Sequence, residues 1–155
     1  MNLYLVQHAE SRPKEEDPQR SLSDQGKTDV EKVAAFVSKH TTLKVDRILH
    51  SGKTRARQTA EVLARYLNPP EGISVAEGME PLADPSTWAN RLAEEKEDLM
   101  LVGHLPHLDK LAAKLICGDE AGSAVMFQNA GIVCLIRDDS GVWSLYWMVT
   151  PRMLK

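Results

Sequence analysis

Three histidines stand directly at or after short apolar runs. A polar side chain at the end of a buried strand suggests a function outside that end of the strand. His8 follows "NLYLVQ", His50 ends "DRILH" and His104 follows "DLMLVG". A neutral imidazole nitrogen is a good nucleophile near pH 7 when the other nitrogen donates its proton to a fixed acceptor. Lys53 and Arg55 come soon after the second run, and a guanidinium binds phosphoryl oxygens well. These residue types can therefore bind and attack a phosphoryl group.

The apolar runs predict the elements that position these side chains. Three runs have the composition of strands buried on both faces of a parallel sheet: residues 2–7, 46–51 and 98–104. Each run is followed by apolar residues at helical spacing, in residues 21–40, 52–67 and 105–118. Ser23 is the expected N-cap of the first helix. Because ligands bind outside the carboxyl ends of parallel strands, we expect the polar residues there to meet in one crevice.

The remaining segments complete an α/β fold. Residues 73–97 predict a short strand, a loop with two prolines and a modest helix, and residues 130–149 predict two strands joined as a hairpin. Alternating strands and helices favour parallel crossovers with helices on both faces of the sheet. We therefore expect residues 1–155 to form one domain, a three-layer α/β/α sandwich with a mostly parallel central sheet and a C-terminal hairpin.

Composition and charge exclude several classes of protein. The formal net charge is -3, with 43% hydrophobic and 26% charged residues, so the polybasic excess of nucleic-acid-binding proteins is missing. No apolar run approaches the roughly 20 residues of a membrane span, and we expect a cytoplasmic protein that binds neither nucleic acid nor membrane. Cys117 and Cys134 both lie in apolar surroundings, so we expect buried free thiols instead of a disulfide.

Four segments resemble motifs of the histidine phosphatase superfamily. "LVQHAES" is similar to its first-strand motif, usually Arg-His-Gly, and "VGHLPHL" to its second-histidine motif. "RSLSDQG" resembles Arg-Pro-Leu-Thr-x-x-Gly, and "LHSGKTRARQTAE" resembles Ser-x-x-x-Arg-Ala-x-Gln-Thr-Ala. The match spans the chain in order. The short chain without a large cap insertion resembles the SixA-type phosphohistidine phosphatases, which implies a phosphoglycerate mutase-like fold.

The resemblance implies a role for individual residues. His8 would be the nucleophile that becomes phosphorylated, Arg55 the clamp on the phosphoryl oxygens, and His104 a second ligand of those oxygens. Arg20 and Ser51 would be further phosphate or substrate contacts. No metal and no cofactor are expected.

The chain departs from the family pattern at Gln7, where arginine is usual, and at Ala9, where glycine is usual. We assign Gln7 to the phosphate contacts, but its amide donates only neutral hydrogen bonds. An uncompensated loss of the charged contact would cost about 1.5 to 3 kcal/mol, roughly 10 to 150-fold in rate. Arg12, Lys53 or Arg57 could restore part of the charge. Ala9 is tolerated unless its backbone requires a positive φ.

The leaving group separates the candidate substrates. An alkoxide usually needs a general acid, whereas a phosphorylated imidazole can leave as a neutral ring. Glu80 is the candidate acid, with Glu77 and Asp84 as alternatives on the same loop. We expect a monomeric phosphohistidine phosphatase that acts on a phosphorylated protein. The alternatives are a phosphate or phosphohistidine binding module with weak or lost turnover because of Gln7, and a small-molecule phosphomonoesterase.

Overall fold

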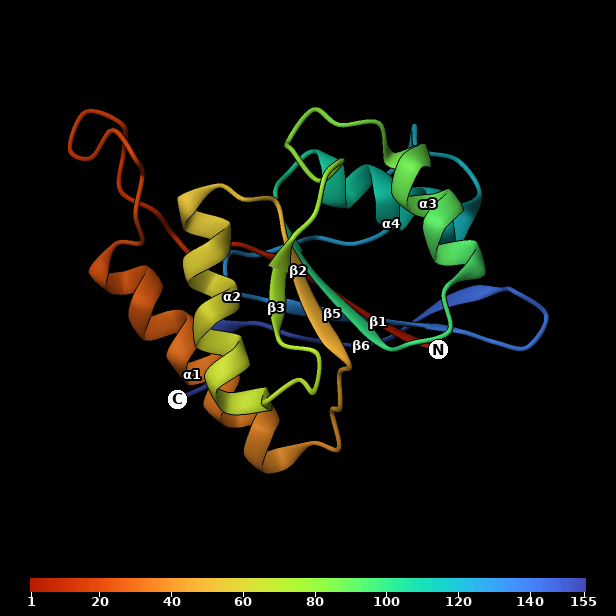
Figure 1. The fold of residues 1–155 in the computed structure, drawn as a ribbon, viewed down its shortest axis with the longest axis horizontal. Coiled ribbons are helices and arrows are strands. Elements are labelled where there is room, and N and C mark those ends of the chain that lie inside the picture. Colours follow the sequence, from red (N-terminus) through yellow and green to blue (C-terminus); the bar gives the residue numbers. More distant parts are fainter.

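A six-stranded sheet with the strand order β3-β2-β4-β1-β5-β6 runs through the middle of the computed structural model, which describes residues 1–155 (Figure 1). The strands are β1 (Asn2–Gln7), β2 (Arg47–His50), β3 (Ile73–Val75), β4 (Leu99–Gly103), β5 (Ile132–Arg137) and β6 (Trp143–Val149). The first four are parallel to one another, and β5 and β6 form the antiparallel hairpin. The predicted mostly parallel sheet with a C-terminal hairpin is confirmed.

Helices cover both faces of this sheet (Figure 1). They are α1 (Asp24–His40), α2 (Thr54–Leu67), α3 (Pro85–Glu94) and α4 (His107–Cys117), with a final 3-10 turn, η1 (Pro151–Met153). The apolar residues of α1 and α2 pack on one face of the sheet, and those of α3 and α4 pack on the other. The three-layer sandwich expected from the alternation of strands and helices is therefore confirmed.

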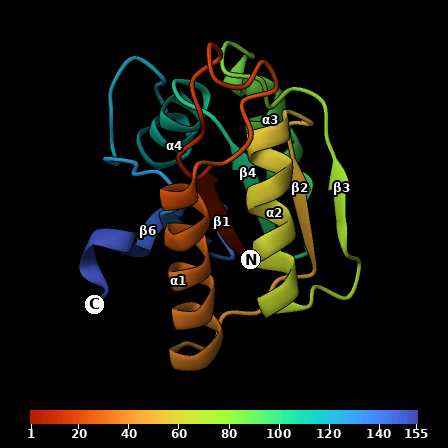
Figure 2. The same cartoon turned by 90° about the vertical axis from the view of Figure 1, so that its left-hand side faces the viewer.

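The register of the parallel strands brings three distant segments to one edge of the sheet. Gln7 at the end of β1 pairs with Gly103 at the end of β4, and His50 at the end of β2 pairs with Val102. Because these strands run in the same direction, the residues that follow them emerge at the same edge. The loop from β1 to α1 lies there too, beside the beginning of α2 (Figure 2).

The first turn of α1 is fastened to the loop that carries the candidate nucleophile. The side chain of Ser23 caps the helix by accepting from the backbone N–H of Gly26, as predicted. A Cβ atom at Gly26 would lie 2.1 Å from the carbonyl oxygen of Glu10. The close approach of the two backbones therefore requires glycine at position 26. Glu10, the residue that it approaches, stands two residues after His8 in the chain.

The two thiols differ in their surroundings. Cys134 is buried, as predicted, but Cys117 is exposed, so the prediction of two buried thiols is wrong for Cys117. The apolar stripe of α4 is turned toward the sheet, and Cys117 lies outside it at the last residue of the helix. None of the helices combines the length and apolar character needed to cross a membrane.

Candidate active site

His8 is held by hydrogen bonds to its backbone and to one nitrogen of its ring. The backbone N–H of His8 donates to the carbonyl of Gly103 at 3.1 Å, and the backbone carbonyl of His8 accepts from the side-chain Nδ2 of Asn129 at 2.8 Å. The ring atom Nδ1 lies 2.7 Å from the carbonyl oxygen of Ala9. A carbonyl oxygen can only accept, so Nδ1 carries the proton and Nε2 keeps its lone pair. That tautomer is the nucleophilic one.

His104 lies beside His8 at the end of β4. The ring centroids are 5.1 Å apart, with the planes inclined at 52°. Nε2 of His104 is 2.6 Å from Oγ of Ser51, and Nδ1 is buried without a hydrogen-bond partner. The hydroxyl of Ser51 is thus hydrogen-bonded to the second histidine and orients that ring, and a contact of Ser51 with phosphate stays a prediction.

Both rings are kept neutral by their surroundings. Burial lowers the pKa of His8 to about 4, and the charges of Arg55 and Arg20 act in the same direction against the opposing hydrogen bond to Ala9. Burial likewise lowers the pKa of His104 to about 3, with His8, Arg55 and Lys53 adding to the effect. A histidine with such a pKa is unprotonated at pH 7 and can act as a nucleophile without first losing a proton.

Two arginines near these rings have no carboxylate partner. Arg55, in the first turn of α2, has a buried Nε without a hydrogen bond, and its pKa is lowered by burial and by the charge of Arg20. Arg20 donates from Nη2 to Ser11 Oγ at 3.0 Å and has a positive φ of 51°. Neither arginine takes part in an ion pair. Guanidinium groups close together and unmatched by carboxylates favour an anion between them.

The two departures from the family pattern have different structural consequences. The backbone of Ala9 does not have a positive φ, and its methyl group is fully buried in the apolar core. Alanine is therefore accommodated without strain. Gln7 is half-buried, and its Oε1 has no hydrogen-bond partner although it is removed from solvent. A buried amide oxygen without a donor is costly.

Sequence reasoning missed three residues that support the site. Thr59 Oγ1 accepts from the N–H of Ala9 at 3.0 Å and donates to the carbonyl of Arg55 at 2.8 Å. Asn129 holds the carbonyl of His8, and the N–H of Ala130, a residue with a φ of 62°, donates to the carbonyl of Gln7. Thr59 stands within one of the segments that resemble family motifs, and this position in the sequence could have identified it. Nothing in the sequence singled out Asn129 and Ala130.

The acidic loop lies near a different histidine. Glu80 is exposed, and the Asp84 side chain caps α3 by accepting from Ser86 N. Both carboxylates oppose the lowering of the pKa of His107, which burial produces, whereas neither contributes to the pKa of His8 or His104. Glu80 as a general acid therefore remains a prediction that this geometry does not strengthen.

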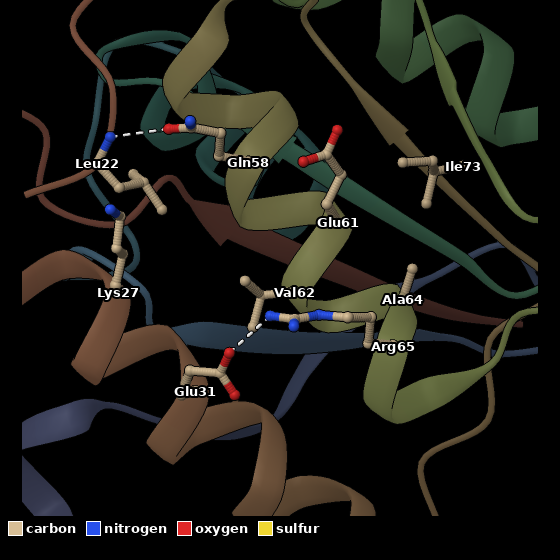
Figure 3. A pocket seen from close by; sticks show the side chains of 9 residues that line it. All are labelled: Leu22, Lys27, Glu31, Gln58, Glu61, Val62, Ala64, Arg65 and Ile73. Carbon is tan, nitrogen blue, oxygen red and sulfur yellow. Dashed lines mark hydrogen bonds and ion pairs between the residues drawn. The ribbon is translucent and has the colours of Figure 1, made fainter. Parts of the chain in front are cut away.

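Several hollows in the surface lie away from the two histidines. The groove between α1 and α2, with a volume of about 730 Å³, contains Gln58, whose side chain accepts from the N–H of Leu22, and the ion pair of Arg65 with Glu31 (Figure 3). Neither this groove nor the other main hollows are lined by His8, Arg55 or His104.

Solved structures share this fold over the whole chain. The protein histidine phosphatase SixA complexed with tungstate superimposes with a TM-score of 0.87 at 24% identity, covering 100% of both chains. A phosphoserine phosphatase mutant from Entamoeba histolytica in complex with phosphoserine has a TM-score of 0.71 at 16% identity, covering 99% of both chains. The phosphoglycerate mutase-like fold is confirmed, and proteins with different substrates share it.

Sequence comparisons give the family. Phosphohistidine phosphatase SixA of Escherichia coli (strain K12) is 27% identical over 160 residues, which cover 100% of this chain and 97% of SixA. An uncharacterized protein of Picosynechococcus sp. is 34% identical over 142 residues, covering 87% of this chain and 84% of that protein. The family model of the histidine phosphatase superfamily (branch 1) matches residues 3–81, a range that includes β1 and α2. The chain therefore belongs to branch 1 of the histidine phosphatase superfamily.

Proposed function

We propose that this phosphatase removes phosphoryl groups from phosphohistidine residues of another protein, through a covalent phosphohistidine on Nε2 of His8. The observation that carries the proposal is the pair of neutral imidazoles, 5.1 Å apart, beside the unpaired guanidinium of Arg55. Similarity to SixA, a phosphohistidine phosphatase that the chain covers along nearly its full length, supports the substrate class.

The first step is an in-line transfer to His8. The lone pair of Nε2 forms a bond to phosphorus, and the bond from phosphorus to the substrate nitrogen breaks. The electron pair of that bond stays on the substrate ring, which leaves as a neutral imidazole when its other nitrogen carries a proton. His8 keeps the proton on Nδ1, and this N–H donates a hydrogen bond to the carbonyl of Ala9, which stabilises the positive ring that forms.

The second step returns His8 to its starting state. A water oxygen attacks phosphorus, the bond to Nε2 breaks, and the electron pair returns to the ring of His8. The protons of the water leave with the product as dihydrogen phosphate, so no proton has to be supplied by the protein. Arg55, Arg20 and His104 would stabilise charge on the equatorial oxygens in both steps, which is where phosphoryl transfer needs most help.

The charges around the two histidines support a phosphohistidine substrate. A phosphorylated imidazole can leave as a neutral ring, and no carboxylate is among the groups that shift the pKa of His8 or His104. A phosphomonoester would need an acid at its leaving oxygen, and Glu80 acts on the pKa of His107 instead of the two site histidines. Small phosphoesters are therefore the less favoured substrates.

Gln7 favours a second candidate, a phosphate or phosphohistidine binding module with weak or lost turnover. Its buried Oε1 has no partner, and no guanidinium occupies that position. Such a module would bind the phosphoryl group through Arg55 and Arg20 and would release product slowly. The two candidates make opposite predictions for multiple turnover.

Labelling and turnover test both candidates. The purified protein is mixed with a phosphohistidine-carrying protein labelled with ³²P, and with phosphoserine and p-nitrophenyl phosphate for comparison. We expect multiple turnover on the phosphohistidine protein and, after rapid quenching, acid-labile and base-stable label on the phosphatase. The label should be absent in His8→Asn and present in His40→Asn, a matched change of an exposed histidine at the end of α1. Binding without turnover would support the module, and faster hydrolysis of the small esters would contradict the protein substrate.

A further inference from the structure

Arg12, Lys53 and Arg57 are the three cations that could replace the charge that Gln7 lacks. They differ in whether a carboxylate already pairs with them. Arg57 forms an ion pair with Glu61 at 2.8 Å, one turn along α2. Arg12 lies 3.7 Å from Asp24. The remaining cation, Lys53, has no carboxylate within ion-pair distance.

Lys53 also has a position that the other two lack. It is the last residue before α2, and its N–H donates to Oγ of Ser51 at 3.3 Å. The same oxygen lies 2.6 Å from Nε2 of His104. A single hydroxyl therefore joins the backbone of Lys53 to the second histidine. The charge of Lys53 reaches this histidine and lowers its pKa.

The helix does not explain a lysine at this place. A cation at the amino-terminal end of a helix opposes the macrodipole, which favours anions there, and Lys53 gives α2 no side-chain cap. The side chain is exposed, so burial of its stem does not account for it either. Lys53 and Arg55 stand two residues apart at the beginning of α2, neither forms an ion pair, and the charges of both lower the pKa of His104. An anion bound beside His104 would account for these unmatched cations.

We propose that Lys53 is a phosphoryl-binding residue that supplies the positive charge missing at Gln7. The inference rests on the proposed function. The ammonium would contact a phosphoryl oxygen from the α2 side, while the neutral amide of Gln7 donates from the β1 side. The chain thus divides between two residues the contact that one arginine makes in the family motif. A lysine binds as a point charge and not as a planar bidentate group, so the contact is more tolerant of geometry.

Binding of inorganic phosphate, measured by isothermal titration calorimetry, tests Lys53 without requiring turnover. We expect Lys53→Gln to weaken binding about tenfold, the effect of losing a charged hydrogen bond of about 1.4 kcal/mol. Arg57→Gln, which removes a cation of the same helix already paired with Glu61, should change binding less than twofold. Equal affinities of wild type and Lys53→Gln, or equal losses in the two variants, would overturn the inference.

A double-mutant cycle asks whether Lys53 and residue 7 supply the same charge. If they do, Gln7→Arg should restore phosphate binding in the Lys53→Gln background and should gain much less in the wild-type background. Equal gains in both backgrounds would show independent contacts and would overturn the division of roles. Failure of the proposed function has a different signature, because wild-type protein would then bind phosphate with the same dependence on Lys53 yet show no turnover. Wild-type protein that does not bind phosphate at all would overturn both.

Discussion

Replacing Thr59 by valine removes one hydroxyl that joins two parts of the active site. The side chain is fully buried. Its Oγ1 accepts from the N–H of Ala9, next to His8, and donates to the carbonyl of Arg55 in the first turn of α2. The residue thus fixes the loop that carries His8, the proposed nucleophile, to the helix that carries Arg55, the proposed clamp.

The size of the effect follows from what valine leaves behind. Valine has nearly the shape of threonine, so no cavity forms, but the buried N–H of Ala9 loses its acceptor. An unsatisfied buried donor costs about 1 to 3 kcal/mol, and we take about 2 kcal/mol as the expected loss in the free energy of unfolding. In a domain of this size that corresponds to a decrease in Tm of about 4 to 8 °C. Because misplacement of a reacting group by about 1 Å can cost about 100-fold in rate, activity should fall more than stability suggests.

Thermal and urea unfolding measure the stability, and hydrolysis of a phosphohistidine protein measures the activity. Thr59→Ser is the matched control, because it keeps the hydroxyl and loses one methyl group, worth about 1 kcal/mol. We expect Thr59→Ser to stay near wild type in activity and Thr59→Val to fall well below it. The reasoning is refuted if Thr59→Val unfolds within 0.5 kcal/mol of wild type, or if both variants lose the same activity.

Three further predictions concern neighbouring parts of the site. Gly26→Ala should destabilise by about 3 kcal/mol in urea unfolding, because its Cβ would meet the carbonyl of Glu10; a stabilised variant, as helix propensity alone predicts, would contradict the close approach. Ser51→Ala should lower kcat about tenfold by releasing the ring of His104; an unchanged kcat would exclude this orienting role. Since the pKa of His104 is lowered to about 3, the unfolded chain binds a proton below pH 6.5 that the folded chain does not. Stability should therefore fall by about 2 kcal/mol between pH 7 and pH 5 through this residue, and urea unfolding of wild type and His104→Asn should differ by that pH-dependent amount.

The sheet and its helices could be predicted because their signals are local. The apolar run before His8 and the helical spacing of Val30, Val33 and Val37 are properties of neighbouring residues, and burial in a three-layer fold makes use of both. Placement of His8 and His104 side by side followed from one further rule, that parallel strands end at the same edge. The structure agrees with this part of the reasoning at the level of individual residues.

The supporting contacts could not be predicted because their partners are distant in the chain and follow no period. Asn129 reaches the carbonyl of His8 across 121 residues, and Thr59 reaches Ala9 across 50. Composition and spacing carry no information about such pairs. The hydrogen bond of Ser51 to His104 belongs to the same class. A sequence motif contains Ser51 and Thr59 but left their hydrogen bonds undetermined, and no motif contains Asn129.

The unpaired cations of the site have two effects that act together. Burial and the charges of Arg55, Arg20 and Lys53 keep the pKa values of His8 and His104 low, so both rings are neutral. A phosphoryl dianion bound among these cations would cancel their field and add an attraction for a proton, which raises the pKa of a neighbouring imidazole. In the proposed mechanism His8 would not take up this proton, because its free nitrogen would become bonded to phosphorus. His104 has no such bond, so substrate binding would favour a proton on the second histidine when a donor to the phosphoryl oxygens is needed.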